Sequence, residues 1–195
     1  MKTIITARLS SVLFAALALT SCSPWTAEDR IALAKLEAKA QQGDPQALYN
    51  LGACYLNGLA TYTNVGLAAD CWRKAAEKGY APAQLQYAHC FWRGTGVSQN
   101  ISNAVHWFGR AALQGESEAQ HNFGFAYLNG LGVPKDKSAA IMWLTKAASQ
   151  GNAGSAFELA QLYIKDETGD PAIEAQGVQW LRKAAQMDYP AAQYN

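Results

Sequence analysis

Residues 119–151 read AQHNFGFAYLNGLGVPKDKSAAIMWLTKAASQG, and this stretch decides the fold. In its second half, from Ala140 to Ala148, small and apolar residues recur at the spacing of one face of an α-helix. The first half shows the same helical spacing. Between the halves, NGLGVP at 129–134 supplies two glycines and a proline, which end one helix and prepare the next. The stretch therefore predicts two helices joined by a short turn.

The same pattern recurs along the chain with a step of 36 residues. The columns that carry the repeat are Gly52, Ala88, Gly124 and Ala160; Tyr55, Phe91, Tyr127 and Tyr163; Ala47, Ala83, Ala119 and Ser155; and Gly79, Gly115 and Gly151. The small residues of the first column are expected to let the two helices of a unit approach closely. No useful length of chain alternates with the period of two that marks a strand. The sequence therefore predicts an all-α fold, an α-solenoid of stacked antiparallel helix pairs.

These columns resemble the Sel-one-like repeats, which are relatives of the tetratricopeptide repeats. The family pattern runs A-x-x-x-L-G-x-x-Y-x-x-G-x-G-V, then a loop, then A-x-x-W-x-x-x-A-A-x-x-G, and the copy at 119–151 matches nearly every position. The first copy departs from it, with Ala60 for the second loop glycine and Cys71 in the tryptophan column. The fourth copy has Asp166 for the first loop glycine, followed by a longer loop. The resemblance implies a curved superhelix with a concave face.

The repeat array is expected to cover residues 44–195, as four repeats and a truncated fifth. Residues 22–43 form a lipidated N-terminus, a short linker and a capping helix, for which Thr26 is the predicted N-cap. The last residues match the start of a repeat and stop within its first helix, at Asn195. Two interpretations of that end are open, a truncated sequence and a short final cap.

Residues 1–21 have the features of an export signal, with Lys2 and Arg8 before an apolar core at 12–19. The core ends in Leu-Thr-Ser followed by Cys22, which resembles the bacterial lipobox. The resemblance implies that Cys22 is acylated and anchors the chain in a membrane, and Ser23 resembles the pattern of outer-membrane lipoproteins facing the periplasm. An ordinary secretory signal with Cys22 nearby by chance is the alternative.

Charge and motifs argue against several function classes. Lys2 and Arg8 fall in the leader, which leaves 14 of the 16 basic residues against 15 acidic ones, and this near-neutral balance disfavours nucleic acid as a partner. The three histidines, His89, His106 and His121, suggest no metal site because no third ligand is evident. No nucleophile elbow or phosphate-binding loop is present in the sequence. We therefore expect a chain without a cofactor, metal or catalytic residue.

The resemblance to tetratricopeptide repeats implies that first-helix residues line the concave face and bind a protein or peptide. The expected residues, rich in the aromatic and arginine side chains that dominate protein interfaces, are Tyr49, Asn50, Leu85, Gln86, His89, Trp92, Arg93, His121, Asn122, Phe125 and Phe157. The alternative for any of them is packing between repeats. The expected role is that of an adaptor or scaffold, and the rival role is a periplasmic immunity protein that neutralises a secreted toxin such as a phospholipase.

Three cysteines remain beyond Cys22, in an oxidising compartment if the chain is exported. Cys54 and Cys90 share a column, and neighbouring helix axes lie roughly 8–10 Å apart, too far for a disulfide. A pairing of Cys54 with Cys71 within one helix pair is the better candidate. Three small buried thiols are the equal alternative.

Overall fold

The computed structural model describes residues 25–165, 170–187 and 189–192, within which it contains helices and no strand. Cys22, the predicted leader at 1–21 and the chain end at 193–195 lie outside the described residues, as does the segment 166–169 of the fourth loop. Among the helices of the described residues, none is long and apolar enough to cross a membrane.

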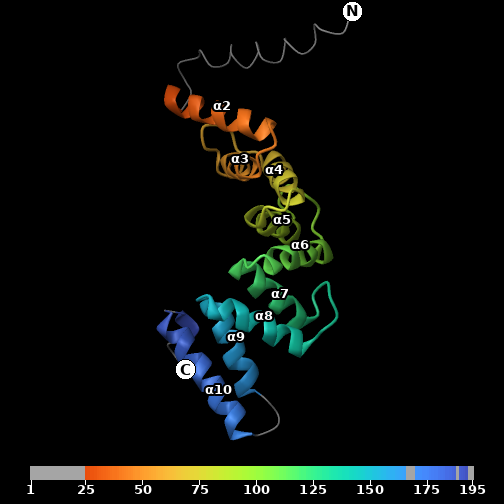
Figure 1. The fold of residues 1–195 in the computed structure, drawn as a ribbon, viewed down its shortest axis with the longest axis vertical. Coiled ribbons are helices and arrows are strands. Elements are labelled where there is room, and N and C mark those ends of the chain that lie inside the picture. The colour runs from red at the N-terminus through yellow and green to blue at the C-terminus, as the bar shows by residue number, and fades with distance from the viewer. Residues whose placement is uncertain (1–24, 166–169, 188, 193–195) are drawn as a thin grey trace, which may run out of the picture.

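The helices are arranged as one N-terminal helix followed by four antiparallel pairs. They are α2 (Ala27–Gln41), α3 (Pro45–Asn57), α4 (Val65–Glu77), α5 (Ala81–Arg93), α6 (Ile101–Leu113), α7 (Ser117–Asn129), α8 (Lys137–Ser149), α9 (Ala153–Ile164) and α10 (Pro171–Gln186), and a 3₁₀ turn, η1 (Pro190–Ala192), follows. Each helix contacts the next one in the chain, and the pairs stack along one long axis (Figure 1). The predicted α-solenoid is confirmed.

Helix α2 begins at the residue that the sequence indicated. The Thr26 side chain accepts a hydrogen bond from the Asp29 backbone amide at 3.1 Å, and the Asp29 carboxylate accepts one from the Thr26 amide at 2.8 Å. This reciprocal capping box satisfies two amides that have no partner within the helix. Thr26 is therefore the N-cap.

Within each pair the two helices approach closely at the small-residue column. A β-carbon added to Gly52 would lie 2.6 Å from Trp72 Nε1, and one added to Gly124 would lie 2.9 Å from Leu144 Cγ. The Trp72 indole crosses to α3 at this point and donates a hydrogen bond to the Tyr49 carbonyl at 3.1 Å. The expectation that small residues permit close helix approach is confirmed at these two positions.

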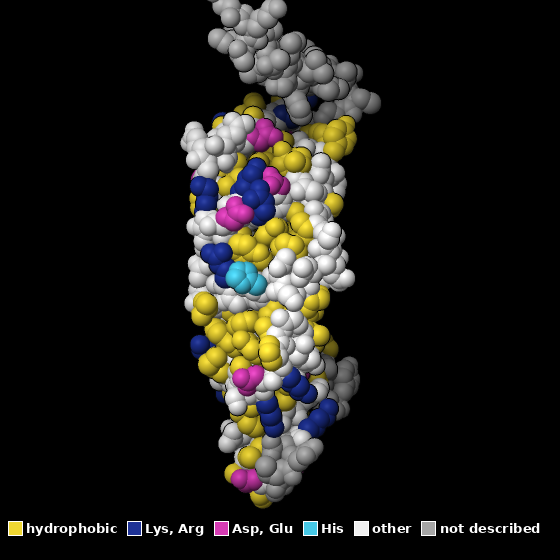
Figure 2. Space-filling view, turned by 90° about the vertical axis from the view of Figure 1, so that its right-hand side faces the viewer, with side chains coloured by type: hydrophobic (Ala, Val, Ile, Leu, Met, Phe, Trp, Pro, Cys, Tyr) yellow, Lys and Arg dark blue, Asp and Glu magenta, His cyan; other side chains and the backbone are white. Residues whose placement is uncertain are grey.

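The core runs along the array instead of filling one centre. The paired alanines of the second helices are at most 3% exposed in three successive units, at Ala75–Ala76, Ala111–Ala112 and Ala147–Ala148. Large hydrophobic side chains also remain at the surface, such as Tyr62 at 78% and Leu113 at 76% exposed. Figure 2 shows one face of the array, where hydrophobic patches alternate with charged side chains.

A pair of glutamines links successive units, a feature that the repeat columns contained but the sequence analysis did not use. Gln84 is 1% exposed, and its side chain donates to the Ala76 carbonyl of the preceding unit at 3.1 Å and accepts from Gln114 Nε2 at 2.7 Å. One repeat later, Gln120 donates to Ala112 at 3.2 Å and accepts from Gln150 at 2.8 Å. These side chains give the helix-end carbonyls of Ala76 and Ala112 a second hydrogen bond, beside the one each accepts from the backbone amide of Gly79 or Gly115.

Candidate protein-binding face

The predicted binding residues lie on the first helices of the four pairs, α3, α5, α7 and α9. Ten of the eleven are accessible: Asn50 and Arg93 are exposed, and Tyr49, Gln86, His89, Trp92, His121, Asn122, Phe125 and Phe157 are half-buried. We call these ten residues the first-helix face.

Leu85 requires a correction, because it does not present accessible surface. It is 7% exposed and belongs to a core cluster that also contains Ala88 and Phe108. A first helix packs against both the helix before it and the helix after it, so its buried stripe is wide. The repeat position that Leu85 occupies borders this buried stripe. In the second unit, the side chain of Leu85 lies inside the stripe.

Contacts between consecutive first helices make the face continuous. His89 Nε2 of α5 lies 2.8 Å from Glu118 Oε1 of α7, and the hydrogen bond between His121 Nδ1 of α7 and Ser155 Oγ of α9 measures 2.9 Å. At the other end, the rings of Tyr49 and Tyr80 meet edge-on with centroids 5.6 Å apart. The face therefore spans all four units.

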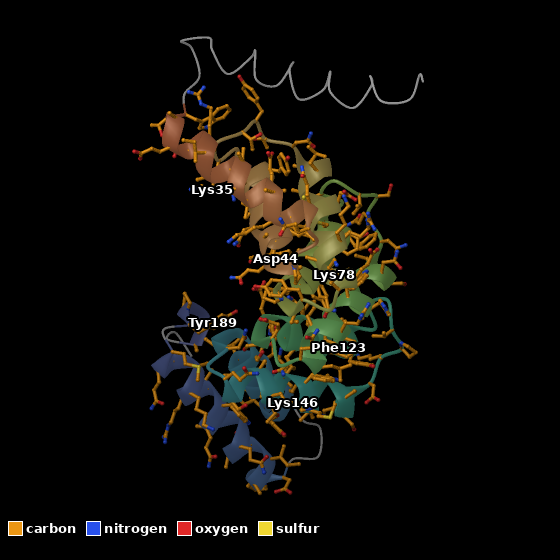
Figure 3. The ribbon with its side chains drawn as sticks, turned by 45° about the horizontal axis from the view of Figure 1, so that its top comes forward. Lys35, Asp44, Lys78, Phe123, Lys146 and Tyr189 are labelled. Atoms are coloured by element: carbon orange, nitrogen blue, oxygen red, sulfur yellow. The ribbon has the colours of Figure 1, made fainter. Side chains whose placement is uncertain are left out.

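The three large apolar side chains of the face differ in what they contact. Trp92 packs against the core, with its ring 6.1 Å from that of Phe108. Phe157 meets Tyr189 at 5.0 Å, and Figure 3 shows Tyr189 on the inner side of the bend that the array follows. Phe125 stacks beside His121 at 6.5 Å and belongs to none of the three core clusters. Phe125 is therefore the side chain of the face least committed to packing.

Burial controls the electrostatics of the face. It lowers the pKa of His121, an effect that nearby Glu118 opposes, and the imidazole is therefore neutral near pH 7. Burial also raises the pKa of Tyr49, with smaller contributions from Tyr80, Glu116 and Glu118. The face thus offers neutral hydrogen-bonding groups, aromatic rings and the guanidinium group of Arg93, beside an acidic start of α7.

The described residues contain no group of three His, Cys, Asp or Glu side chains that could hold a metal ion. His89 and His121 are instead occupied by Glu118 and Ser155. The face offers hydrogen bonding, apolar contact and the positive charge of Arg93.

Cys54, Cys71 and Cys90 are free thiols in the structure, which does not contain the Cys54–Cys71 disulfide. Cys71 belongs to the first core cluster, whereas Cys54 is half-buried and does not. Burial raises the pKa of both Cys71 and Cys90 to about 11. The alternative of small buried thiols thus describes Cys71 and Cys90.

Comparison with known proteins shows four matches to the Sel1 repeat, at residues 45–80, 81–116, 117–152 and 153–189. Each match covers one helix pair. These matches confirm the family resemblance drawn from the repeat columns.

Solved structures with this fold include a protective antigen of uropathogenic Escherichia coli strains, at 35% identity and a TM-score of 0.74 over 79% of this chain and 33% of that one. A Sel1 repeat protein from Oxalobacter formigenes is 33% identical, with a TM-score of 0.75 over 89% of this chain and 51% of that one. Among curated proteins, DAP3-binding cell death enhancer 1 of Rattus norvegicus is 44% identical over 45 residues, which are 23% of this chain and 9% of the rat protein. The chain thus spans about half of the length of the Oxalobacter formigenes protein and smaller shares of the other two.

Proposed function

The chain belongs to the Sel1 repeat family, and from this premise we propose that it is a non-enzymatic adaptor that binds a protein or peptide on its first-helix face while Cys22 holds it at a bacterial membrane. Sel1 repeat proteins are generally scaffolds, and their fold suits protein interaction. The observation that carries the proposal is the continuity of accessible aromatic and hydrogen-bonding side chains across four units. Contiguous surfaces of this kind mark interaction sites.

Partner capture tests the binding part of the proposal. The full lipidated chain is used as bait in native bacterial membranes, beside a Phe125→Ala variant and a Leu113→Ala variant as matched control. Leu113 is 76% exposed and is the last residue of the second helix α6, so it is not one of the residues of the first-helix face. We expect one protein to be enriched with the wild type and the control, and to be reduced about tenfold with Phe125→Ala. Equal enrichment with all three baits would contradict the use of this face.

Fractionation tests the membrane tether, which is supported by the Leu-Thr-Ser-Cys sequence ending at Cys22. A Cys22→Ser variant cannot be acylated through sulfur, and we expect it to move from the membrane fraction to the soluble fraction while its melting temperature is unchanged. A variant that stays in the membrane fraction would exclude the lipid anchor and leave the binding proposal standing.

The rival role, a periplasmic immunity protein, uses the same face and differs only in the partner. No contact in the described residues favours it over an adaptor role. Mass spectrometry of the captured protein distinguishes them, because the immunity role requires a secreted toxin such as a phospholipase.

A further inference from the structure

The first helix pair contains a cavity of about 610 Å³ that the first-helix face does not include. It lies between α2, α3 and α4, with Leu48, Leu51 and Tyr55 on one wall and Cys71 on the other. Lys78 lines it as well, with its ammonium group beside Gly43, and Figure 3 shows Lys78 near Asp44 in the N-terminal half of the array. We call this cavity the Cys71 slot.

The repeat register shows what the slot lacks. Residues 36 positions after Cys71 and Leu51 are Trp107 and Tyr87, whose rings meet at 5.4 Å. One repeat further, Trp143 meets Phe123 at 5.3 Å in the same register. In the second and third units an indole therefore lies between the helices of the pair, and in the first unit a cysteine leaves that place open.

The hydrogen-bonded glutamine pair is also missing from the first unit. The positions of Gln84 and Gln114, which are joined by a hydrogen bond of 2.7 Å, correspond to Leu48 and Lys78 in the first unit. Leucine offers no acceptor, so the side chain of Lys78 cannot form the equivalent bond. In the first unit these two places hold Leu48, which is 5% exposed, and Lys78, and both side chains line the slot without a hydrogen bond between them.

The walls of the slot retain the cationic side chain that, in the second and third units, stacks on the tryptophan ring. Arg110 lies 4.8 Å from the centroid of Trp107, and Lys146 lies 4.3 Å from that of Trp143. Lys74 occupies the same place relative to Cys71 and lines the slot. A ring entering the slot would therefore find a cation at the position where cation–π contact occurs in the other units.

The slot is lined by two carboxylates, Glu37 and Asp70, and by two ammonium groups, Lys74 and Lys78, of which Lys78 can pair with an acidic group beside that ring. Asp70 is neutralised by Arg73 at 2.6 Å and by Lys74 at 2.7 Å, and the Tyr55 hydroxyl donates to Glu37 at 3.4 Å. Lys78 forms no ion pair with any described residue. Lys78 is therefore available to a carboxylate brought by the occupant.

We propose that the Cys71 slot binds a tryptophan side chain of a partner protein, adjacent to an acidic residue whose carboxylate pairs with Lys78. The indole replaces the ring that Trp107 and Trp143 supply in the following units, and the carboxylate fixes its orientation. This contact uses the N-terminal end of the array and is independent of the first-helix face.

The test is amide chemical-shift titration of the isotope-labelled full chain in detergent micelles. The probe is the peptide acetyl-Gly-Trp-Glu-Gly-amide, and its matched controls carry Ala for Trp, or Lys for Glu. We expect the probe to shift amides around Cys71, Lys74 and Lys78, and each control peptide to bind about tenfold more weakly.

Two protein variants complete the test. Cys71→Trp places the chain's own indole in the slot, so we expect it to abolish probe binding and to raise the melting temperature. Lys78→Gln keeps the slot open, and it should weaken binding of the probe without changing binding of the peptide that carries Lys for Glu. The proposal would be overturned if the probe bound Cys71→Trp undiminished, or if the Ala peptide bound as well as the probe. It would also be overturned by concentration-dependent shifts at the slot without peptide, which would indicate a second copy of the chain as the occupant.

Discussion

Gly96, in the turn between α5 and α6, lies so close to Val65 at the start of α4 that a β-carbon on Gly96 would be 2.2 Å from the Val65 carbonyl oxygen. One repeat later, a β-carbon on Gly132 would be 2.9 Å from Ser102 Cα at the start of α6. The turn of each of these units therefore rests on the second helix of the preceding unit. This contact adds to the glutamine pairs in holding the array together.

Replacing Gly96 by alanine is expected to destabilise the chain more than the same change at Gly94. Both glycines have left-handed backbones, with φ of 73° and 72°, so both variants bear a similar conformational cost of about 1–2 kcal/mol. Only Gly96 also meets backbone below van der Waals distance, since the nearest atom to a β-carbon at Gly94 is 3.4 Å away. In urea denaturation, the free energy of unfolding of Gly96→Ala should be about 1–3 kcal/mol lower than that of Gly94→Ala. Equal losses would show that the turn does not bear on α4.

Ala60 is the residue of this column in the first unit, and it has a φ of 57° that alanine adopts only with strain. We expect Ala60→Gly to raise the melting temperature by about 2–4 °C, as a gain of about 1 kcal/mol does in a chain of this size. The control is Ala53→Gly within α3, where glycine should lower the melting temperature. A decrease in both variants would contradict the strain at Ala60.

The buried glutamine pair can be tested by a double-mutant cycle. Replacing Gln84 or Gln114 by alanine removes the 2.7 Å hydrogen bond between them, and Gln84→Ala also removes the side-chain donor of the Ala76 carbonyl, which keeps the backbone amide of Gly79. We expect a coupling free energy of about 1 kcal/mol from the two single variants and the double variant. Additive losses would mean that this bond does not contribute to stability.

Stability is expected to fall as the pH decreases below about 6.5 because His121 is buried. Its pKa is lowered in the folded chain from the ordinary value of 6.5, so between the two values the unfolded chain binds more protons. The stabilisation is fully present above pH 6.5 and is lost as the pH falls through the folded-state pKa. Melting temperatures from pH 7.5 to pH 5 should decrease less in His121→Gln than in the wild type. Parallel curves for the two proteins would contradict this.

The helical repeat was predictable because each unit contains the same small, aromatic and glycine positions at a fixed step. Those positions determine helix contact and turn geometry locally, as Gly52 and Gly96 show. The burial of Leu85 was not predictable in this way. Residues of one column share a direction on the helix, yet their exposure depends on the side chains of neighbouring units.

The glutamine pairs and the Cys71 slot were visible in the columns but were interpreted differently or passed over. Gln84 and Gln120 recur in register with Gln114 and Gln150, and this joint recurrence of polar residues was the available signal. The sequence shows Cys71 in the tryptophan column, and from the sequence alone a disulfide with Cys54 and a small buried thiol are equal alternatives. Only the packing of Trp107 in the next unit shows that the missing ring leaves a cavity.

The central claim is that a protein partner lies on the first-helix face, and site-specific photocrosslinking tests it most directly. A photoreactive phenylalanine analogue is placed at Phe125 or, as control, at Leu113 in the full lipidated chain, and bacteria are irradiated before lysis. Our account predicts a light-dependent adduct with one partner protein from position 125 and none from position 113. An adduct from position 113 alone, or capture of the partner without any adduct from position 125, would contradict it.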